Sequence, residues 1–100
     1  AEHFAGIPTA SNAPTIAAAL QLDAACDVLL ACADAKEAQA LSELSGVKTV
    51  KALVHARFAQ VLAEDLAPII QSLANNYTHI LAPSTTFGKN LMPRLAAILD

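Results

Sequence analysis

Apolar residues recur along the chain at spacings that alternate between those of strands and those of helices. Val28–Ala33 (VLLACA) is a continuous apolar run, which is typical of a strand covered on both faces. Val47–His55 has the period-two alternation of a second strand. Thr78–Ala82 is a shorter β-prone run, and Pro83 ends it because proline cannot donate to a strand ladder. These segments are the three predicted strands.

Between these strands the apolar residues follow helical spacing. We predict helices over residues 12–22, 35–45 and 64–75. Asn12 and Asp34 are suited to cap the first two helices, and Gly46 is suited to end the second. Pro68 fits the first turn of the third helix, where a missing N–H costs nothing.

A fourth helix closes the chain, and two starting points for it stay open. The apolar period reaches back to Phe87, with a cap among residues 84–86, but Pro93 would then kink the helix. If Asn90 is the cap instead, Pro93 lies in the first turn.

Helices that alternate with strands predict an α/β fold with a parallel sheet and right-handed crossovers. Residues 1–11 have no clean period, so we expect a loop there with no strand before it. The last residues belong to the closing helix. We therefore expect residues 1–100 to be one partial α/β domain of a longer protein.

Composition narrows the possible functions. The chain has a net charge of −3, which argues against nucleic-acid binding, because that function requires clustered Lys and Arg. No apolar run approaches the ~20 residues needed to cross a bilayer, so we expect no membrane insertion. Cys26 and Cys32 would lie about 20 Å apart along an extended strand, too far for a disulfide. We expect two free thiols and a reducing compartment.

The turn from Pro83 to Asn90 carries hydroxyls and a Gly-Lys pair before a helix, a pattern that suggests anion binding. It is not a Walker loop, because Pro83 stands where that motif needs its first glycine and Asn90 where it needs Ser or Thr. The candidate anion-binding residues are Ser84, Thr85, Gly88 and Lys89. The simpler interpretation is helix capping by a hydroxyl, with Gly88 permitting close packing.

The sequence does not indicate metal binding or nucleophilic catalysis. His3, His55 and His79 are far apart in the sequence and share no metal-ligand spacing with the cysteines. No serine lies in a G-x-S-x-G nucleophile elbow. We expect no catalytic residue and no metal site.

Two runs, YTHILA at residues 77–82 and FGKNLMPRLAA at residues 87–97, carry a family resemblance. They resemble the N-terminal domain of the electron transfer flavoprotein alpha subunit. The sequence AEH at residues 1–3 is similar to that family's exit from its first strand, and LAPII at residues 66–70 to the helix before the signature. The similarity spans this chain but only the leading, smaller part of an alpha subunit.

The resemblance implies a three-layer α/β/α fold of the adenine-nucleotide alpha-hydrolase-like type, with its central first strand missing here. It implies an electron carrier rather than an enzyme. Full-length members pair with a beta subunit and bind FAD. They accept electrons from acyl-CoA and other dehydrogenases and pass them to a quinone reductase of the respiratory chain, in the bacterial cytoplasm or the mitochondrial matrix.

The family's FAD contacts lie in the C-terminal domain, which these residues do not include. The resemblance therefore implies no cofactor-binding residue in this chain and a structural role in subunit packing. The alternative hypothesis is a small nucleotide- or phosphate-binding α/β module that uses the loop at residues 84–90.

Overall fold

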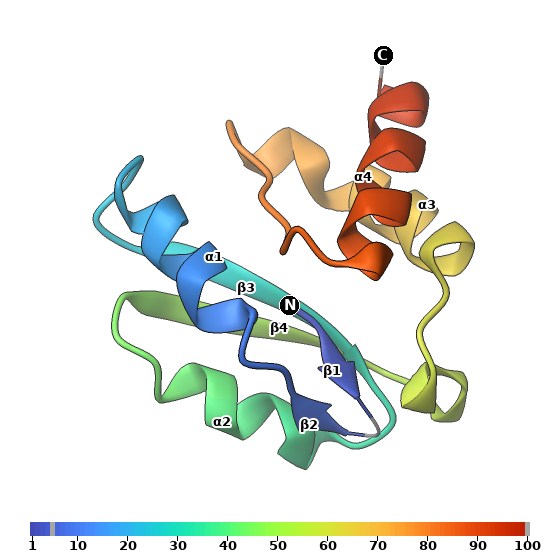
Figure 1. Cartoon of the computed structure of the whole chain (residues 1–100), viewed down its shortest axis with the longest axis horizontal. Coiled ribbons are helices and arrows are strands. Elements are labelled where there is room, and N and C mark those ends of the chain that lie inside the picture. The colour runs from blue at the N-terminus through green and yellow to red at the C-terminus, as the bar shows by residue number, and fades with distance from the viewer. Residues whose placement is uncertain (5, 100) are drawn as a thin grey trace.

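The computed structural model describes residues 1–4 and 6–99, and a two-stranded parallel sheet lies at its centre (Figure 1). Strands β3 (Cys26–Cys32) and β4 (Val47–Val54) pair in parallel, with Val28 opposite Val50. The parallel arrangement confirms the predicted α/β class. Strand β3 begins two residues earlier than predicted, and its register is irregular between Cys26 and Asp27.

Helices cover both faces of this sheet and make three layers. On one face α1 (Asn12–Leu20), the 3-10 helix η1 (Ala35–Ala38) and α2 (Gln39–Ser42) pack against the sheet. On the other face lie α3 (Ala63–Leu73) and α4 (Thr86–Leu99). Short 3-10 helices η2 (Ala56–Ala59) and η3 (Ala74–Asn76) flank α3.

Alternate residues of β3 enter different cores, as the pleat of a strand requires. Leu30 packs with Ile16 and Leu41 on the α1–α2 face. Ala31 packs with Phe58 and Leu66 on the α3–α4 face. A strand buried on both faces must be apolar throughout, so the unbroken VLLACA run follows directly from its central place.

The loop predicted at residues 1–11 contains a small antiparallel hairpin. Strands β1 (His3–Phe4) and β2 (Ile7–Pro8) pair, with Phe4 opposite Ile7. Gly6 lies in the turn with φ +85°, a conformation that L side chains rarely adopt. Two-residue strands are too short to produce a periodic pattern, so periodicity could not predict them.

The helix predicted over residues 35–45 forms as two short pieces, η1 and α2, and ends earlier. Its start agrees with the prediction, since the Asp34 side chain accepts from the Lys36 N–H at 2.9 Å. Its end does not, because α2 stops at Ser42 and Gly46, with φ +88°, lies in the turn before β4. The predicted cap Asn12 is instead the first residue of α1, with Ser11 at the cap position.

Two prolines lie in the interior of helices. Pro68 is the sixth residue of α3 rather than part of its first turn, which was the prediction. Helix α4 begins at Thr86 with Pro93 in its interior, so the first of the two alternatives for its start is the one that forms. Both prolines are exposed, as are Glu64 and Lys89, the residues four positions earlier whose carbonyl groups lack an N–H donor. Water can satisfy those carbonyls, and this lowers the cost of each proline.

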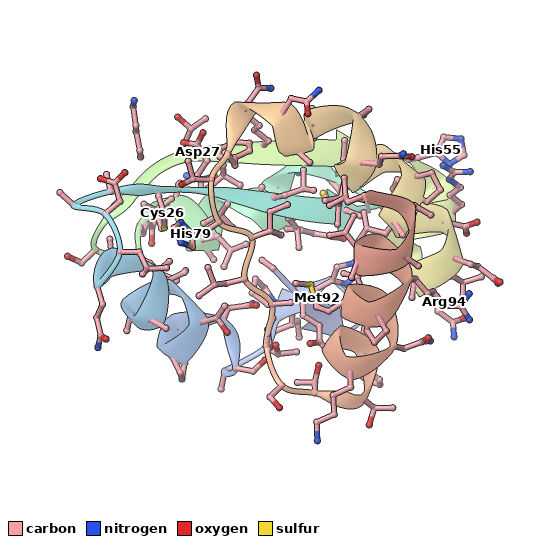
Figure 2. All side chains as sticks on the ribbon, turned by 90° about the horizontal axis from the view of Figure 1, so that it is seen from above. Cys26, Asp27, His55, His79, Met92 and Arg94 are labelled. Carbon is pink, nitrogen blue, oxygen red and sulfur yellow. The ribbon has the colours of Figure 1, made fainter. Side chains whose placement is uncertain are left out.

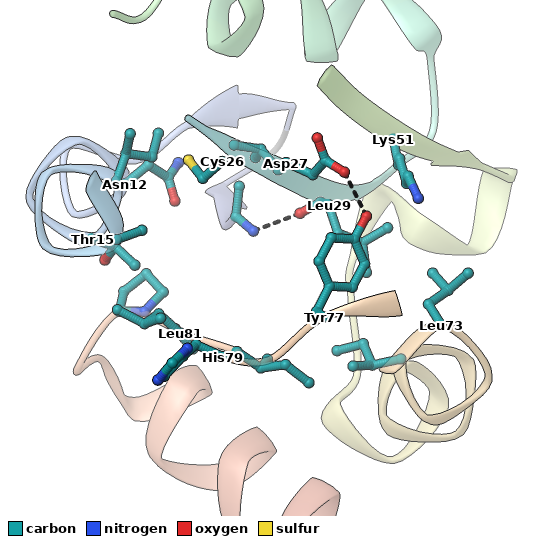
Figure 3. Close-up of a pocket in the computed structure, with 18 of the residues that line it drawn as sticks. Asn12, Thr15, Cys26, Asp27, Leu29, Lys51, Leu73, Tyr77, His79 and Leu81 are labelled. Atoms are coloured by element: carbon teal, nitrogen blue, oxygen red, sulfur yellow. Dashed lines mark hydrogen bonds between the residues drawn. The ribbon is translucent and has the colours of Figure 1, made fainter. Parts of the chain in front are cut away.

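The third predicted strand does not form. Thr78–Ala82 has no ladder partner, and the sheet contains only β3 and β4 among the described residues. A strand is stabilised by hydrogen bonds to a neighbour, but the segment lies across a cavity from β3 (Figure 3). The nitrogen of Ala1 donates to the Leu29 carbonyl on the β3 side of this cavity, at 2.5 Å.

Candidate functional site

The four anion-binding candidates lie at the start of α4, with Ser84 and Thr85 before the helix and Gly88 and Lys89 among its first residues, and the structure gives them different roles. Thr85 precedes the helix, and its Oγ1 accepts from the Gly88 N–H at 3.1 Å. The same hydroxyl donates to Oε2 of Glu2 at 2.7 Å. Thr85 is thus the cap of α4, as the capping interpretation expected.

Gly88 is required by close packing. A Cβ atom added there would lie 1.8 Å from the backbone oxygen of Pro83, far inside contact distance. Ser84 and Lys89 are exposed, and the Lys89 backbone N–H donates to the Thr85 carbonyl at 2.8 Å. The hydroxyl of Thr85 and the N–H of Gly88 are therefore already engaged within the protein.

Glu2 reaches this turn because Asn12 holds its backbone. The Asn12 side-chain amide donates to the Glu2 carbonyl at 2.7 Å, and its oxygen accepts from the Glu2 N–H at 2.8 Å. Asn12 is 3% exposed and is the buried polar residue of the described core. Sequence reasoning missed the roles of Glu2 and Asn12, since a contact between residues 83 positions apart leaves no local signal.

A cavity of 520 Å³ lies between β3, α1 and the segment 77–83. Figure 3 shows Cys26, Asp27 and Leu29 on one side and Tyr77, His79 and Leu81 on the other. The cavity thus separates the β3 edge from the segment predicted to be the third strand.

A polar contact closes one end of this cavity. The Tyr77 hydroxyl donates to Oδ2 of Asp27 at 2.6 Å (Figure 3). The Lys51 ammonium lies 5.2 Å from the centre of the Tyr77 ring, within cation–π range. The Tyr77 hydroxyl raises the pKa of Lys51, with the charge of Asp27 adding to the effect. These residues tie the segment after α3 to the amino end of β3 and to the middle of β4.

The thiols and imidazoles behave as structural groups. Cys26 and Cys32 are both free, as predicted, and burial raises the pKa of each thiol. Nδ1 of His55 accepts from the Arg57 N–H at 3.1 Å, which caps η2 just after the end of β4. His55 and His79 lie at opposite ends of the molecule (Figure 2). No cluster suited to a metal ion occurs among the described residues.

The comparison with known families shows to which family the chain belongs. The model of the electron transfer flavoprotein domain matches residues 1–100, the whole of the chain. The chain belongs to the electron transfer flavoprotein family. The predicted resemblance is therefore confirmed. The match includes the residues of the turn before α4 and of the cavity as well as the run at residues 87–97.

The relatives that match are alpha subunits of electron transfer flavoproteins. The chain is 42% identical over its whole length to the alpha subunit of Pseudomonas aeruginosa, of which it covers 33%. It is 44% identical to that of Paracoccus denitrificans over 74% of this chain and 25% of the relative. The mitochondrial alpha subunit of Dictyostelium discoideum is 39% identical over 63% of the chain and 20% of the relative.

The chain thus spans about a third or less of the length of these relatives. No solved structure matches it significantly. Among the described residues, no helix is both long and apolar enough to cross a bilayer.

Proposed function

We propose that these residues are the N-terminal part of an electron transfer flavoprotein alpha subunit and serve as its structural, subunit-packing domain. The match over residues 1–100 to the family, at 42% identity to an alpha subunit three times as long, carries this proposal. The described residues have a packed three-layer core and no cluster of metal-ligating side chains. The described part of the chain thus suits a scaffold.

The whole protein, on this proposal, binds FAD through residues outside this chain and pairs with a beta subunit. It accepts electrons from acyl-CoA and other dehydrogenases and passes them to a quinone reductase of the respiratory chain. It works in the bacterial cytoplasm or the mitochondrial matrix, where Cys26 and Cys32 stay reduced.

The cavity beside β3 supports the domain organisation. Ala1 already donates to the Leu29 carbonyl, and the β-prone segment 78–82 faces β3 across 520 Å³. In the longer protein, residues preceding Ala1 form a strand that lies between β3 and residues 78–82. This strand supplies the ladder partner that Thr78–Ala82 lacks and completes a parallel sheet.

The experiment is to express the full-length protein with its beta subunit and, separately, residues 1–100. The complex is expected to show flavin absorbance that an acyl-CoA dehydrogenase bleaches in the presence of its substrate, and residues 1–100 are expected to show no flavin absorbance. Stoichiometric FAD on residues 1–100 alone would refute the scaffold role. A full-length complex that binds no flavin would refute the assignment as a whole.

A further inference from the structure

The imidazole of His3 forms hydrogen bonds with both of its ring nitrogens, and the partners fix which nitrogen carries the proton. The Gly6 backbone N–H donates to Nδ1 at 3.0 Å. Nε2 lies 2.9 Å from the carbonyl oxygen of Phe58, a residue 55 positions along the chain. A backbone N–H only donates and a carbonyl only accepts, so Nδ1 carries no proton here and Nε2 carries one.

These two bonds hold the β1–β2 hairpin in place. The bond from Gly6 closes the turn between the two strands, and the bond to Phe58 ties β1 to η2. The strands themselves contribute little burial, because the side chains of the paired residues Phe4 and Ile7 are 82% and 74% exposed. A short two-stranded hairpin is barely stable by itself in water, so this one depends on the ring of His3.

A carboxylate that lacks a hydrogen-bond donor lies against the same turn. A Cβ atom added to Gly6 would lie 2.7 Å from Oε1 of Glu37, so this side chain packs directly on the turn. Oε2 of Glu37 is buried and has no hydrogen-bond partner among the described residues. A buried oxygen without a donor is costly. A proton donor arriving beside the turn would therefore be stabilised by Glu37.

The other charged groups around His3 are engaged or exposed. In η2, Nδ1 of His55 accepts from the Arg57 N–H, so a second titrating ring lies in this region. Beside β1, the carboxylate of Glu2 accepts from the Thr85 hydroxyl. The remaining charged groups of the neighbouring segments are exposed or bonded to backbone groups: Asp34, Lys36, Arg57 and the amino group of Ala1.

We propose that His3 is a pH-operated latch on the β1–β2 hairpin, closed when its ring is neutral and open when its ring is protonated. An imidazole takes up a proton from solvent between about pH 8 and 5. On His3 the vacant position is Nδ1, and once protonated it can no longer accept from the Gly6 N–H. It then donates to the carboxylate of Glu37 instead.

The Nε2 bond to Phe58 is kept in both states, because Nε2 carries a proton in each. Acidification therefore opens the turn while β1 stays on η2, and the exposed pair Phe4 and Ile7 loses its fixed position. The latch does not depend on the flavoprotein assignment, since it rests on the contacts of the hairpin alone.

The test uses the full-length natural protein labelled with ¹⁵N in histidine and glycine, and NMR follows the His3 ring and the Gly6 amide from about pH 8 to 5. His3→Asn is the matched variant, because its side-chain oxygen can accept from the Gly6 N–H but does not titrate. His55→Asn removes the second titrating ring and keeps an acceptor for the η2 cap. Glu37→Gln removes the carboxylate, and Glu43→Gln removes the same charge from an exposed position.

At the alkaline end, the wild-type His3 ring is expected to carry its proton on Nε2 and none on Nδ1. As the pH falls, Nδ1 gains a proton and the Gly6 amide signal shifts with the same midpoint. This shift is expected to persist in His55→Asn and Glu43→Gln and to vanish in His3→Asn. At the acidic end, the Nδ1 proton is expected to exchange with water about tenfold faster in Glu37→Gln than in wild type, as for the loss of a hydrogen bond to a charged group.

A proton on Nδ1 of wild-type His3 at the alkaline end would overturn the proposal without the use of any variant. So would a Gly6 shift that survives in His3→Asn or disappears in His55→Asn. Equal exchange of the Nδ1 proton in wild type and Glu37→Gln would refute the acceptor assigned to the open state. Far-UV circular dichroism checks the folding of each variant, and the wild-type titration decides the matter if His3→Asn does not fold.

Discussion

Asn12 binds Glu2 as a neighbouring strand would, through one donor and one acceptor at 2.7 and 2.8 Å. A side-chain amide has the same donor and acceptor as a peptide group, so it can satisfy a backbone that has no ladder partner on that side. This contact links α1 to the first residues of the chain. Through Glu2 it also reaches Thr85 at the start of α4.

Replacing Asn12 by leucine should therefore destabilise the protein. The substitution keeps the branching at Cγ but leaves the N–H and carbonyl of Glu2 without the Asn12 partner, at a cost of about 2 kcal/mol for two hydrogen bonds. Urea denaturation followed by circular dichroism measures the change. Asn75→Leu is the control, because Asn75 is exposed and should cost little. Equal stability of Asn12→Leu and wild type would contradict the role given to this bond.

Tyr77→Phe should lower the pKa of Lys51. The Tyr77 hydroxyl is the main cause of the raised value, and the phenyl ring of the variant keeps the cation–π contact without it. The sign follows because the hydroxyl favours the protonated ammonium. Lys51 side-chain NMR during a pH titration measures the shift. Asp27→Asn should lower the pKa of Lys51 by less than Tyr77→Phe does, since the Asp27 charge is a smaller cause. A larger shift in Asp27→Asn than in Tyr77→Phe would contradict this prediction.

Gly88→Ala should be destabilising, because the new methyl group meets a backbone carbonyl rather than a flexible side chain. Its Cβ would lie 1.8 Å from the Pro83 oxygen, so the turn must move, at a cost of about 1–3 kcal/mol as in overpacked cores. Ser84→Ala, at an exposed neighbouring position, is the control. Thermal unfolding of the two variants compares them directly. Stabilisation of Gly88→Ala by its better helix propensity would show that the turn relaxes freely.

Both thiols should react slowly with iodoacetamide at neutral pH. Burial raises the pKa of Cys26 and Cys32, and nearby acidic groups add to it, so the thiolate fraction is smaller than for a free cysteine. The rates should rise only at more alkaline pH than for a free thiol. Cys26 is partly exposed and should react first, whereas Cys26→Ser protein should be labelled only after denaturation, because Cys32 is 0% exposed. Mass spectrometry of the labelled protein distinguishes the two sites.

Much of the fold was predictable where the cause is local. The apolar run of β3 reflects burial on both faces, and Asp34 marks a helix start because its side chain caps a free backbone N–H. The order of strands and helices follows from these segments, and a helical connection between successive strands then implies parallel pairing. The capping role of a hydroxyl before α4 was also visible, because capping depends on residues within one turn.

The hairpin at residues 3–8 and the state of Thr78–Ala82 could not be predicted in this way. A β-prone run becomes a strand only when another backbone lies at hydrogen-bonding distance, and here a cavity separates it from β3. The hairpin depends on a positive φ at Gly6, and a glycine in a sequence does not reveal which conformation it adopts.

From its residues alone, this chain specifies where its four main helical segments and its two central strands lie, which sides of them are apolar and which family they resemble, because those properties depend on neighbours a few positions apart. Its folding in three dimensions settles the rest: that Glu2 meets Thr85, that Asn12 serves a backbone rather than a helix cap, and that Tyr77 meets Asp27. These pairs are separated by 10 to 83 residues, and only packing the layers against one another brings them within reach.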